Sequence, residues 1–129
     1  MSTGRWFTRG LLLIFGLLGC GQEIFSPPPG IWVDPAADVY LHDELDAVKA
    51  CMQVDKGRFE DLAITIMPPI FPCDAYATGC AGEYRSPRYI QLGSMYAFRH
   101  EVVHALLDWN IGSLDAEHQS PMFFQCGIA

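Results

Sequence analysis

The sequence predicts an α+β fold, in which two helices and four short strand candidates form one small domain that disulfides hold together. The helices are predicted because apolar residues recur at three- and four-residue intervals in residues 35–52 and 94–110. The strands are predicted because β-branched residues dominate residues 62–67 and two further short runs follow. A length of 129 residues fits one domain with a modest core.

The amino-terminal segment has the pattern of a secretory signal peptide. Two arginines precede an apolar run at residues 11–19 that is too short to span a bilayer as a helix. The ending Leu17-Leu18-Gly19-Cys20 resembles the lipobox of bacterial lipoproteins. That resemblance implies a lipoprotein signal peptide over residues 1–19 and acylation of Cys20, the alternative being an ordinary signal peptide with an incidental cysteine. Because Gly21 is not the aspartate that favours inner-membrane retention, the resemblance favours an outer-membrane anchor in a bacterial cell envelope.

A proline-rich tether at residues 20–30 is expected to separate the anchor from the domain, residues 31–129. Two of the eight basic residues lie in the signal segment, so six remain against fifteen acidic residues and the formal charge becomes −9. Such a surface repels nucleic acid and anionic lipid headgroups. We therefore expect no nucleic-acid partner, and we expect the acyl chains alone to hold the protein on the membrane.

The first half of the domain reads as strand, helix and strand. Residues 31–33 are a short strand candidate, and Asp34 followed by Pro35 is typical of a helix start. The first helix is predicted from Pro35 to Met52, with Leu41, Leu45, Val48 and Met52 on its apolar face. Residues 62–67 then form a strand that we expect to be buried on both faces and that two prolines end.

The second half begins with a long loop, residues 70–80, which prolines stiffen. Residues 81–85 and 88–92 are expected to form an antiparallel pair around Ser86-Pro87. The second helix follows directly.

Four cysteines follow Cys20, and an even number in a small exported domain indicates two disulfides. Three pairings are possible. We expect Cys73–Cys80, because these residues flank a short loop, and Cys51–Cys126, which would clamp the first helix to the carboxyl terminus. A cysteine-rich zinc site is disfavoured because the chain has no C-x-x-C spacing.

The second helix carries the most specific motif, His100-Glu101-Val102-Val103-His104, which is the H-E-x-x-H pattern. Four residues of helix advance about 400° and about 6 Å, so both imidazoles leave one face and can bind one zinc ion. Glu101 is offset from both and can act as the general base for a water molecule. Ser94 is a candidate N-cap, and Gly112 suits the end of the helix.

The order helix, strand, strand pair and H-E-x-x-H helix resembles the core of the zincin metallopeptidases. This resemblance implies a short mixed sheet above a backing helix and an active-site helix. It also implies an antiparallel outermost strand, here residues 82–85 or 89–92, that lines the cleft and binds extended peptide by strand addition.

Catalytic zinc needs a third protein ligand, and three candidates follow the helix: Asp115, Glu117 and His118. The metzincin pattern does not fit, since Leu107 and Asn110 stand where it needs glycine and histidine. A gluzincin-type glutamate usually lies further along the chain than Glu117.

Residues 112–115 are similar to the G-T-x-D pattern of aspzincins, which keeps Asp115 open as a ligand. We favour His118, because imidazole suits zinc and a turn at Gly112 can bring the chain back to the metal. Asp115 would then accept a hydrogen bond from a ligand N–H.

The resemblance implies a monomeric zinc-dependent peptidase, with His100, His104 and His118 holding Zn²⁺ and Glu101 removing a proton from water. Its substrate would be a peptide or protein. A third interpretation is a different hydrolysis, such as amide cleavage in cell-wall peptides. Tyr84, Tyr89 and Tyr96 are candidates for oxyanion stabilisation. The alternative is an envelope lipoprotein that binds zinc or a partner without catalysis.

Overall fold

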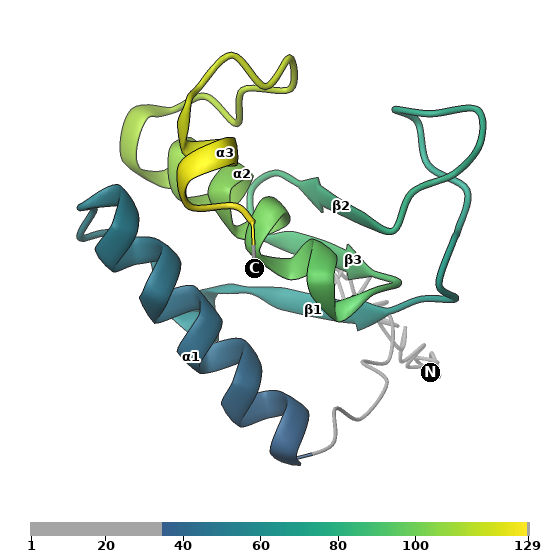
Figure 1. The fold of residues 1–129 in the computed structure, drawn as a ribbon, viewed down its shortest axis with the longest axis horizontal. Coiled ribbons are helices and arrows are strands. Elements are labelled where there is room, and N and C mark those ends of the chain that lie inside the picture. Colours follow the sequence, from purple (N-terminus) through teal and green to yellow (C-terminus); the bar gives the residue numbers. More distant parts are fainter. Residues whose placement is uncertain (1–34, 129) are drawn as a thin grey trace, which may run out of the picture.

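Figure 1 shows the computed structural model of the protein, which describes residues 35–128. The predicted signal peptide, Cys20, the proline-rich tether, the strand candidate at residues 31–33 and Asp34 lie outside the described residues. Within them the fold is α+β, as predicted, with a small mixed sheet, helices and two disulfides.

The two predicted long helices form where the apolar periodicity places them. Helix α1 spans Pro35–Met52 and α2 spans Phe98–Ile111. The backbone N–H of Gly112 donates to Asp108 O, and its left-handed φ of 75° ends α2 in the conformation that glycine tolerates best.

Three short helices were not predicted: η1 (Phe59–Asp61), η2 (Met95–Ala97) and α3 (Met122–Gln125). The predicted N-cap, Ser94, has extended backbone and precedes η2 rather than α2. The Ala97 backbone N–H donates to the Ser94 carbonyl, and η2 leads without a break into α2.

The sheet contains three strands in the order β1-β3-β2. Strand β1 (Ala63–Ile66) runs parallel to the central strand β3 (Tyr89–Leu92), and β2 (Gly82–Arg85) runs antiparallel to β3. The predicted antiparallel pair around Ser86-Pro87 is therefore confirmed. Within the described residues, β2 is an edge strand, on the side of the sheet away from β1.

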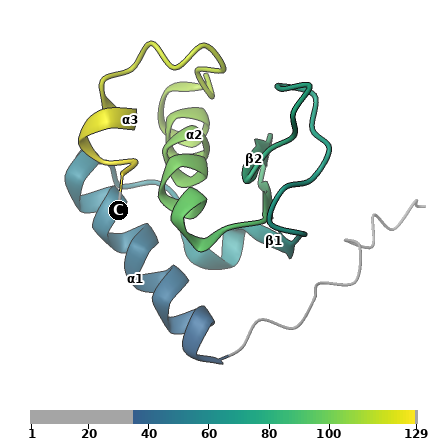
Figure 2. The same ribbon diagram turned by 45° about the vertical axis from the view of Figure 1, so that its right-hand side comes forward.

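The prediction that β1 is buried on both faces is wrong, because each of its residues is half-buried. Figure 2 shows the reason: α1 and α2 lie on the same side of the sheet. Strand β1 is also an edge strand, so its apolar composition reflects one covered face rather than two.

The core lies between the sheet and the two long helices. Its fully buried members come from three elements: Leu41, Leu45 and Val48 of α1, Ile90 and Leu92 of β3, and Phe98, Val102, Val103, Ala105 and Leu106 of α2. Every residue from 101 to 107 is buried. The helix that carries H-E-x-x-H is thus the most enclosed element of the described chain.

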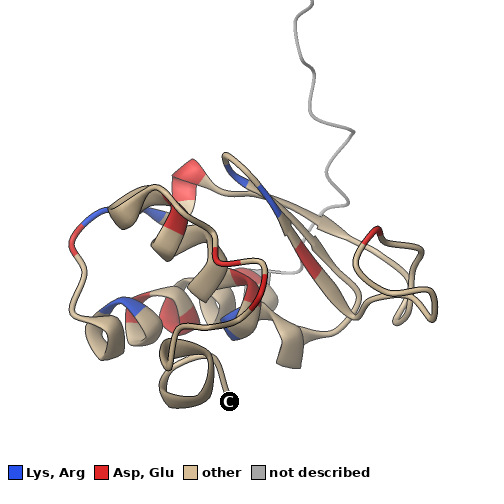
Figure 3. Cartoon of the chain, turned by 90° about the horizontal axis from the view of Figure 1, so that it is seen from above, with Lys and Arg blue, Asp and Glu red and all other residues tan. Residues whose placement is uncertain are grey.

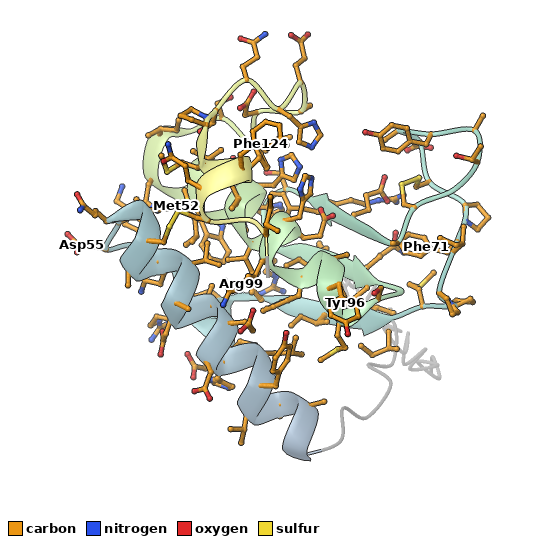
Figure 4. The ribbon with its side chains drawn as sticks, viewed as in Figure 1. Met52, Asp55, Phe71, Tyr96, Arg99 and Phe124 are labelled. Atoms are coloured by element: carbon orange, nitrogen blue, oxygen red, sulfur yellow. A yellow bond between two sulfur atoms is a disulfide. The ribbon has the colours of Figure 1, made fainter. Side chains whose placement is uncertain are left out.

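An ion pair fixes α2 against α1 outside this core. The Arg99 guanidinium, labelled in Figure 4, donates Nε and Nη2 to the two carboxylate oxygens of Glu44 on α1. Its Nη1 donates to Ile128 O at 3.2 Å. Two parallel bonds to one carboxylate fix both orientation and distance, so Arg99 joins both helices to the carboxyl-terminal segment.

The chain has few basic residues, and Figure 3 shows that the basic positions of the described residues do not gather into one patch. No helix within residues 35–128 is both long enough and apolar enough to cross a membrane.

Both predicted disulfides are confirmed. Cys51–Cys126 links the end of α1 to the end of α3 across 75 residues of sequence, and Cys73–Cys80 closes the loop before β2. A bridge between Phe71 and Cys80 pairs the two sides of that loop as well. The two disulfides lie on opposite sides of α2.

The Cys51–Cys126 disulfide should contribute more stability than Cys73–Cys80, because closing the longer loop removes more entropy from the unfolded chain. Replacing the first pair with serine should lower the free energy of unfolding by on the order of 4 kcal/mol, against about 2–3 kcal/mol for the second pair. Urea denaturation followed by circular dichroism measures both. An equal loss, or a larger loss for the Cys73/Cys80 variant, would contradict this ranking.

Candidate metal centre

Helix α2 presents His100 and His104 one turn apart, with ring centroids 5.1 Å from each other. The four-residue spacing places both histidines on one face of the helix. Residues 101–107 of α2 are buried, and both imidazoles line a cavity beside β2. The third candidate ligand must reach this cavity from elsewhere.

A loop at residues 112–121 supplies it. After Gly112 the chain turns back, and two further residues adopt left-handed backbone, Asp115 with φ of 52° and His118 with φ of 56°. Such conformations are uncommon for residues other than glycine and are kept only where the surroundings determine them. The His118 backbone N–H donates to Asp115 O at 3.0 Å, which closes the turn that carries the His118 ring.

The three imidazoles converge through their Nε2 atoms. His118 Nε2 lies 2.8 Å from His100 Nε2 and 3.1 Å from His104 Nε2. The ligand atoms of the three residues all lie within 4.8 Å of one another. The group could therefore hold one metal ion, as the sequence predicted for these three residues.

The tautomer of His104 suits a metal ligand. Its Nδ1 lies 2.6 Å from Leu114 O, and a carbonyl can only accept, so Nδ1 carries the proton and Nε2 offers its lone pair. A hydrogen bond of this kind also fixes the plane of the ring.

Burial keeps two of the imidazoles uncharged. It lowers the pKa of His100 to about 4, and the neighbouring His104 and His118 act in the same direction. Burial also lowers the pKa of His104, partly opposed by the bond to Leu114 O. Neutral rings have free lone pairs at neutral pH, which is the form that binds a metal ion.

Glu101 lines the same cavity as the three imidazoles. It is 5% exposed, and none of the ion pairs within residues 35–128 includes it. Burial raises the pKa of its carboxyl group to about 7, although a hydrogen bond from the Tyr84 backbone N–H acts in the opposite direction. The site therefore combines three converging imidazoles with one buried, uncompensated carboxyl group.

Strand β2 can approach this carboxyl group because it begins with Gly82. A Cβ at that position would lie 2.8 Å from Glu101 Oε1 and 2.8 Å from the Ala97 Cβ. Any larger residue would displace the carboxylate or the strand. Sequence reasoning placed Gly82 in a strand but gave no sign of this role, because the close approach depends on the tertiary packing.

The other two candidate ligands, Asp115 and Glu117, form hydrogen bonds within the loop. The Asp115 carboxylate accepts backbone N–H bonds from Gln119 at 3.1 Å and Ser120 at 2.6 Å. It thus holds the His118 loop in shape, rather than accepting a ring N–H as predicted. Glu117 is exposed and accepts a bond from the Gln119 side chain.

A cavity of about 350 Å³ opens beside the histidines. One wall is β2 with Gly82, Glu83 and Tyr84, and another is the disulfide-closed loop with Asp74 and Tyr76. A second cavity of about 280 Å³ adjoins it and shares Tyr76, Gly82 and Glu101. Residues 81–84 line these two cavities, which we call the groove.

Of the three tyrosines considered from sequence, only Tyr84 lines the larger cavity. Its hydroxyl donates to Asp108 Oδ2 at 2.8 Å, which ties β2 to α2, and both burial and this bond raise the pKa of the phenol. Tyr96 is 82% exposed. Tyr76, which sequence reasoning missed, lines both cavities, and its place in a long loop carries no periodic signal that could have identified it.

Comparison with known proteins assigns no family: no protein-family model, curated protein or solved structure matches the chain. The resemblance to zincins therefore rests on the H-E-x-x-H motif and the order of the elements.

Removing His118 should weaken metal binding more than any other change in the loop. We expect the Zn²⁺ affinity of His118→Ala to fall by more than about 100-fold, because a ligand is lost, and that of Asp115→Ala to fall by about 10–100-fold through loss of loop order. Competition with a chromogenic chelator measures both, with Glu117→Ala as the matched control that should bind normally. If Asp115→Ala strips the metal while His118→Ala retains it, His118 is not the third ligand.

Proposed function

We propose that this protein is a zinc-dependent peptidase of the bacterial cell envelope. One observation supports this most: three imidazole Nε2 atoms converge beside a buried carboxyl group and an open groove. A site built only to bind metal has no need for that carboxyl group.

The donor set fits zinc. Three imidazoles without a thiolate are typical of catalytic zinc sites, whereas structural sites are usually closed and rich in cysteine. Nitrogens that bind one zinc ion at roughly 2.0–2.1 Å lie about 3.3 Å apart, which is close to the 2.8 Å and 3.1 Å that separate His118 Nε2 from the other two Nε2 atoms. The four cysteines within residues 35–128 are all in disulfides and do not compete.

The proposed mechanism assigns one role to each group. His100, His104 and His118 would hold a zinc ion, which would supply polarisation of the scissile carbonyl and a lowered pKa for water. Glu101 accepts the proton of the attacking water and then donates it to the leaving amine. Because Glu101 is buried and forms no ion pair within residues 35–128, no cation there neutralises its carboxylate, which stays available for this exchange.

Strand β2 is suited to hold the substrate. It lies at the edge of the sheet, next to the groove, and its residues 82–84 line the cavity. An extended peptide that added to this edge would gain main-chain hydrogen bonds, with little selection for sequence. Of the two strands that the zincin resemblance left open, β2 rather than β3 has the position for this role, since β3 is central.

The amino-terminal pattern supports an extracytoplasmic location, in which Cys20 carries the lipid anchor. Two disulfides agree with an oxidising compartment, because such bonds are rare in reducing ones. The tether at residues 20–30 would then leave the groove accessible to peptides near the membrane.

Glu101→Gln should separate metal binding from chemistry. The amide keeps the size of the side chain but cannot accept the proton, so Zn²⁺ should stay bound at near-normal stoichiometry while peptide hydrolysis falls by roughly 10²–10⁴-fold or more. Digestion of a broad peptide library, with zinc content measured in parallel, tests this. Glu117→Gln, an exposed change of the same kind in the His118 loop, should cleave as wild type does.

Two outcomes would argue against catalysis. If wild-type protein binds zinc but cleaves nothing in the library, the non-catalytic zinc-binding protein becomes the better description. If cleavage occurs and Glu101→Gln retains it, another group removes the proton.

A further inference from the structure

Helix α3 brings an aromatic side chain, Phe123, against the metal centre. Its ring centroid lies 5.0 Å from that of His100, 4.5 Å from that of His104 and 4.7 Å from that of His118. These separations are typical of packed aromatic rings. Phe123 is only 4% exposed, so the contact lies in the interior and not on the surface.

The three imidazoles differ in how the protein orients them. His104 is fixed through Nδ1 by Leu114 O. For His100 and His118, the hydrogen bonds made by the rings within residues 35–128 join Nε2 atoms only, so no protein acceptor holds Nδ1. A ligand ring usually donates its second N–H to such an acceptor, which sets its plane. Two of the three rings therefore need another constraint.

Phe123 is placed to supply that constraint. The torsion that turns an imidazole about its Cβ–Cγ bond has a broad energy well, so a free ring samples many planes. An apolar ring packed against three imidazoles restricts this rotation for each at once. It does so without offering a competing ligand atom.

The position of Phe123 is itself held from two directions. Phe123 belongs to the buried core cluster, and Cys126, three residues later, is joined to Cys51 on α1. The Cys126 backbone N–H also donates to Met122 O at 2.8 Å, which closes the single turn of α3. The next residue, Phe124, is 78% exposed and is labelled in Figure 4, so only Phe123 of this adjacent pair packs into the core.

We propose that Phe123 is a positioning residue of the metal centre, which sets metal affinity and geometry by orienting the rings of His100, His104 and His118. This inference rests on the metal site of the proposed function, and it does not depend on hydrolysis. Residues of α3 therefore belong to the site although none of them binds the metal.

The test uses Phe123→Leu, which keeps an apolar side chain but removes the ring, and Phe124→Leu, which makes the same change at the exposed neighbour. Affinity for Zn²⁺ is measured by chelator competition, and the visible spectrum of the Co²⁺-loaded protein reports the geometry of the ligands. We expect Phe123→Leu to lose about 10–100-fold in affinity, the range found for residues that support metal ligands, and to shift the Co²⁺ bands. Phe124→Leu should match wild type in both.

A loss of affinity with an unchanged Co²⁺ spectrum would overturn the inference, because a general loss of stability would explain it. Wild-type affinity in a folded Phe123→Leu protein would overturn it as well. If Phe123→Leu does not fold, Phe123→Met, which retains more of the volume without the ring, is measured in its place with the same expected result. A wild-type protein that binds neither ion would overturn both this inference and the proposed function, whereas binding without hydrolysis would leave this inference standing.

Discussion

The structure depends on one spatial requirement: the loop after α2 must fold back to one face of α2, the face that carries His100 and His104. His100 and His104 lie on that face through helical spacing alone, but His118 reaches it only because residues 112–121 fold back. Three left-handed residues, Gly112, Asp115 and His118, make the return possible, and the Asp115 carboxylate stabilises it.

The domain is small, so few buried contacts are available to stabilise such a site. Imidazoles and a carboxyl group at a largely buried position cost stability, because burial disfavours their charged forms and removes polar atoms from water. A domain of this size has a modest core with which to offset that cost. The Cys51–Cys126 disulfide and the Arg99–Glu44 ion pair join α1, α2 and the carboxyl-terminal segment directly. They therefore stabilise the elements that carry or contact the three histidines.

The structural features that the sequence could predict are those that depend on local spacing. Helices α1 and α2, the pairing of residues 82–85 with 89–92, and the placement of His100, Glu101 and His104 on one helix all follow from intervals of two to four residues. His118 was chosen among three candidates by ligand chemistry, and the structure brings it to the other two histidines. The disulfide pairing was favoured because one pair flanks a short loop.

What the sequence could not predict depends on contacts between distant segments. Gly82 matters because β2 passes close to Glu101, and Phe123 matters because α3 reaches the three imidazoles. The half-buried state of β1 follows from both helices lying on one side of the sheet, which an apolar run of residues does not reveal. Asp115 was expected beside a ring N–H, but the sharp turn directs its carboxylate to backbone N–H groups instead.

The central claim is that His100, His104 and His118 together bind one zinc ion. X-ray absorption at the zinc edge of the zinc-loaded protein tests it most directly, since it reports the atoms bound to the metal. The account predicts one zinc per chain, with three imidazole nitrogens at roughly 2.0–2.1 Å, one further light atom and no sulfur. Fewer than three imidazoles, a sulfur ligand, or failure to bind zinc in a one-to-one ratio would contradict it.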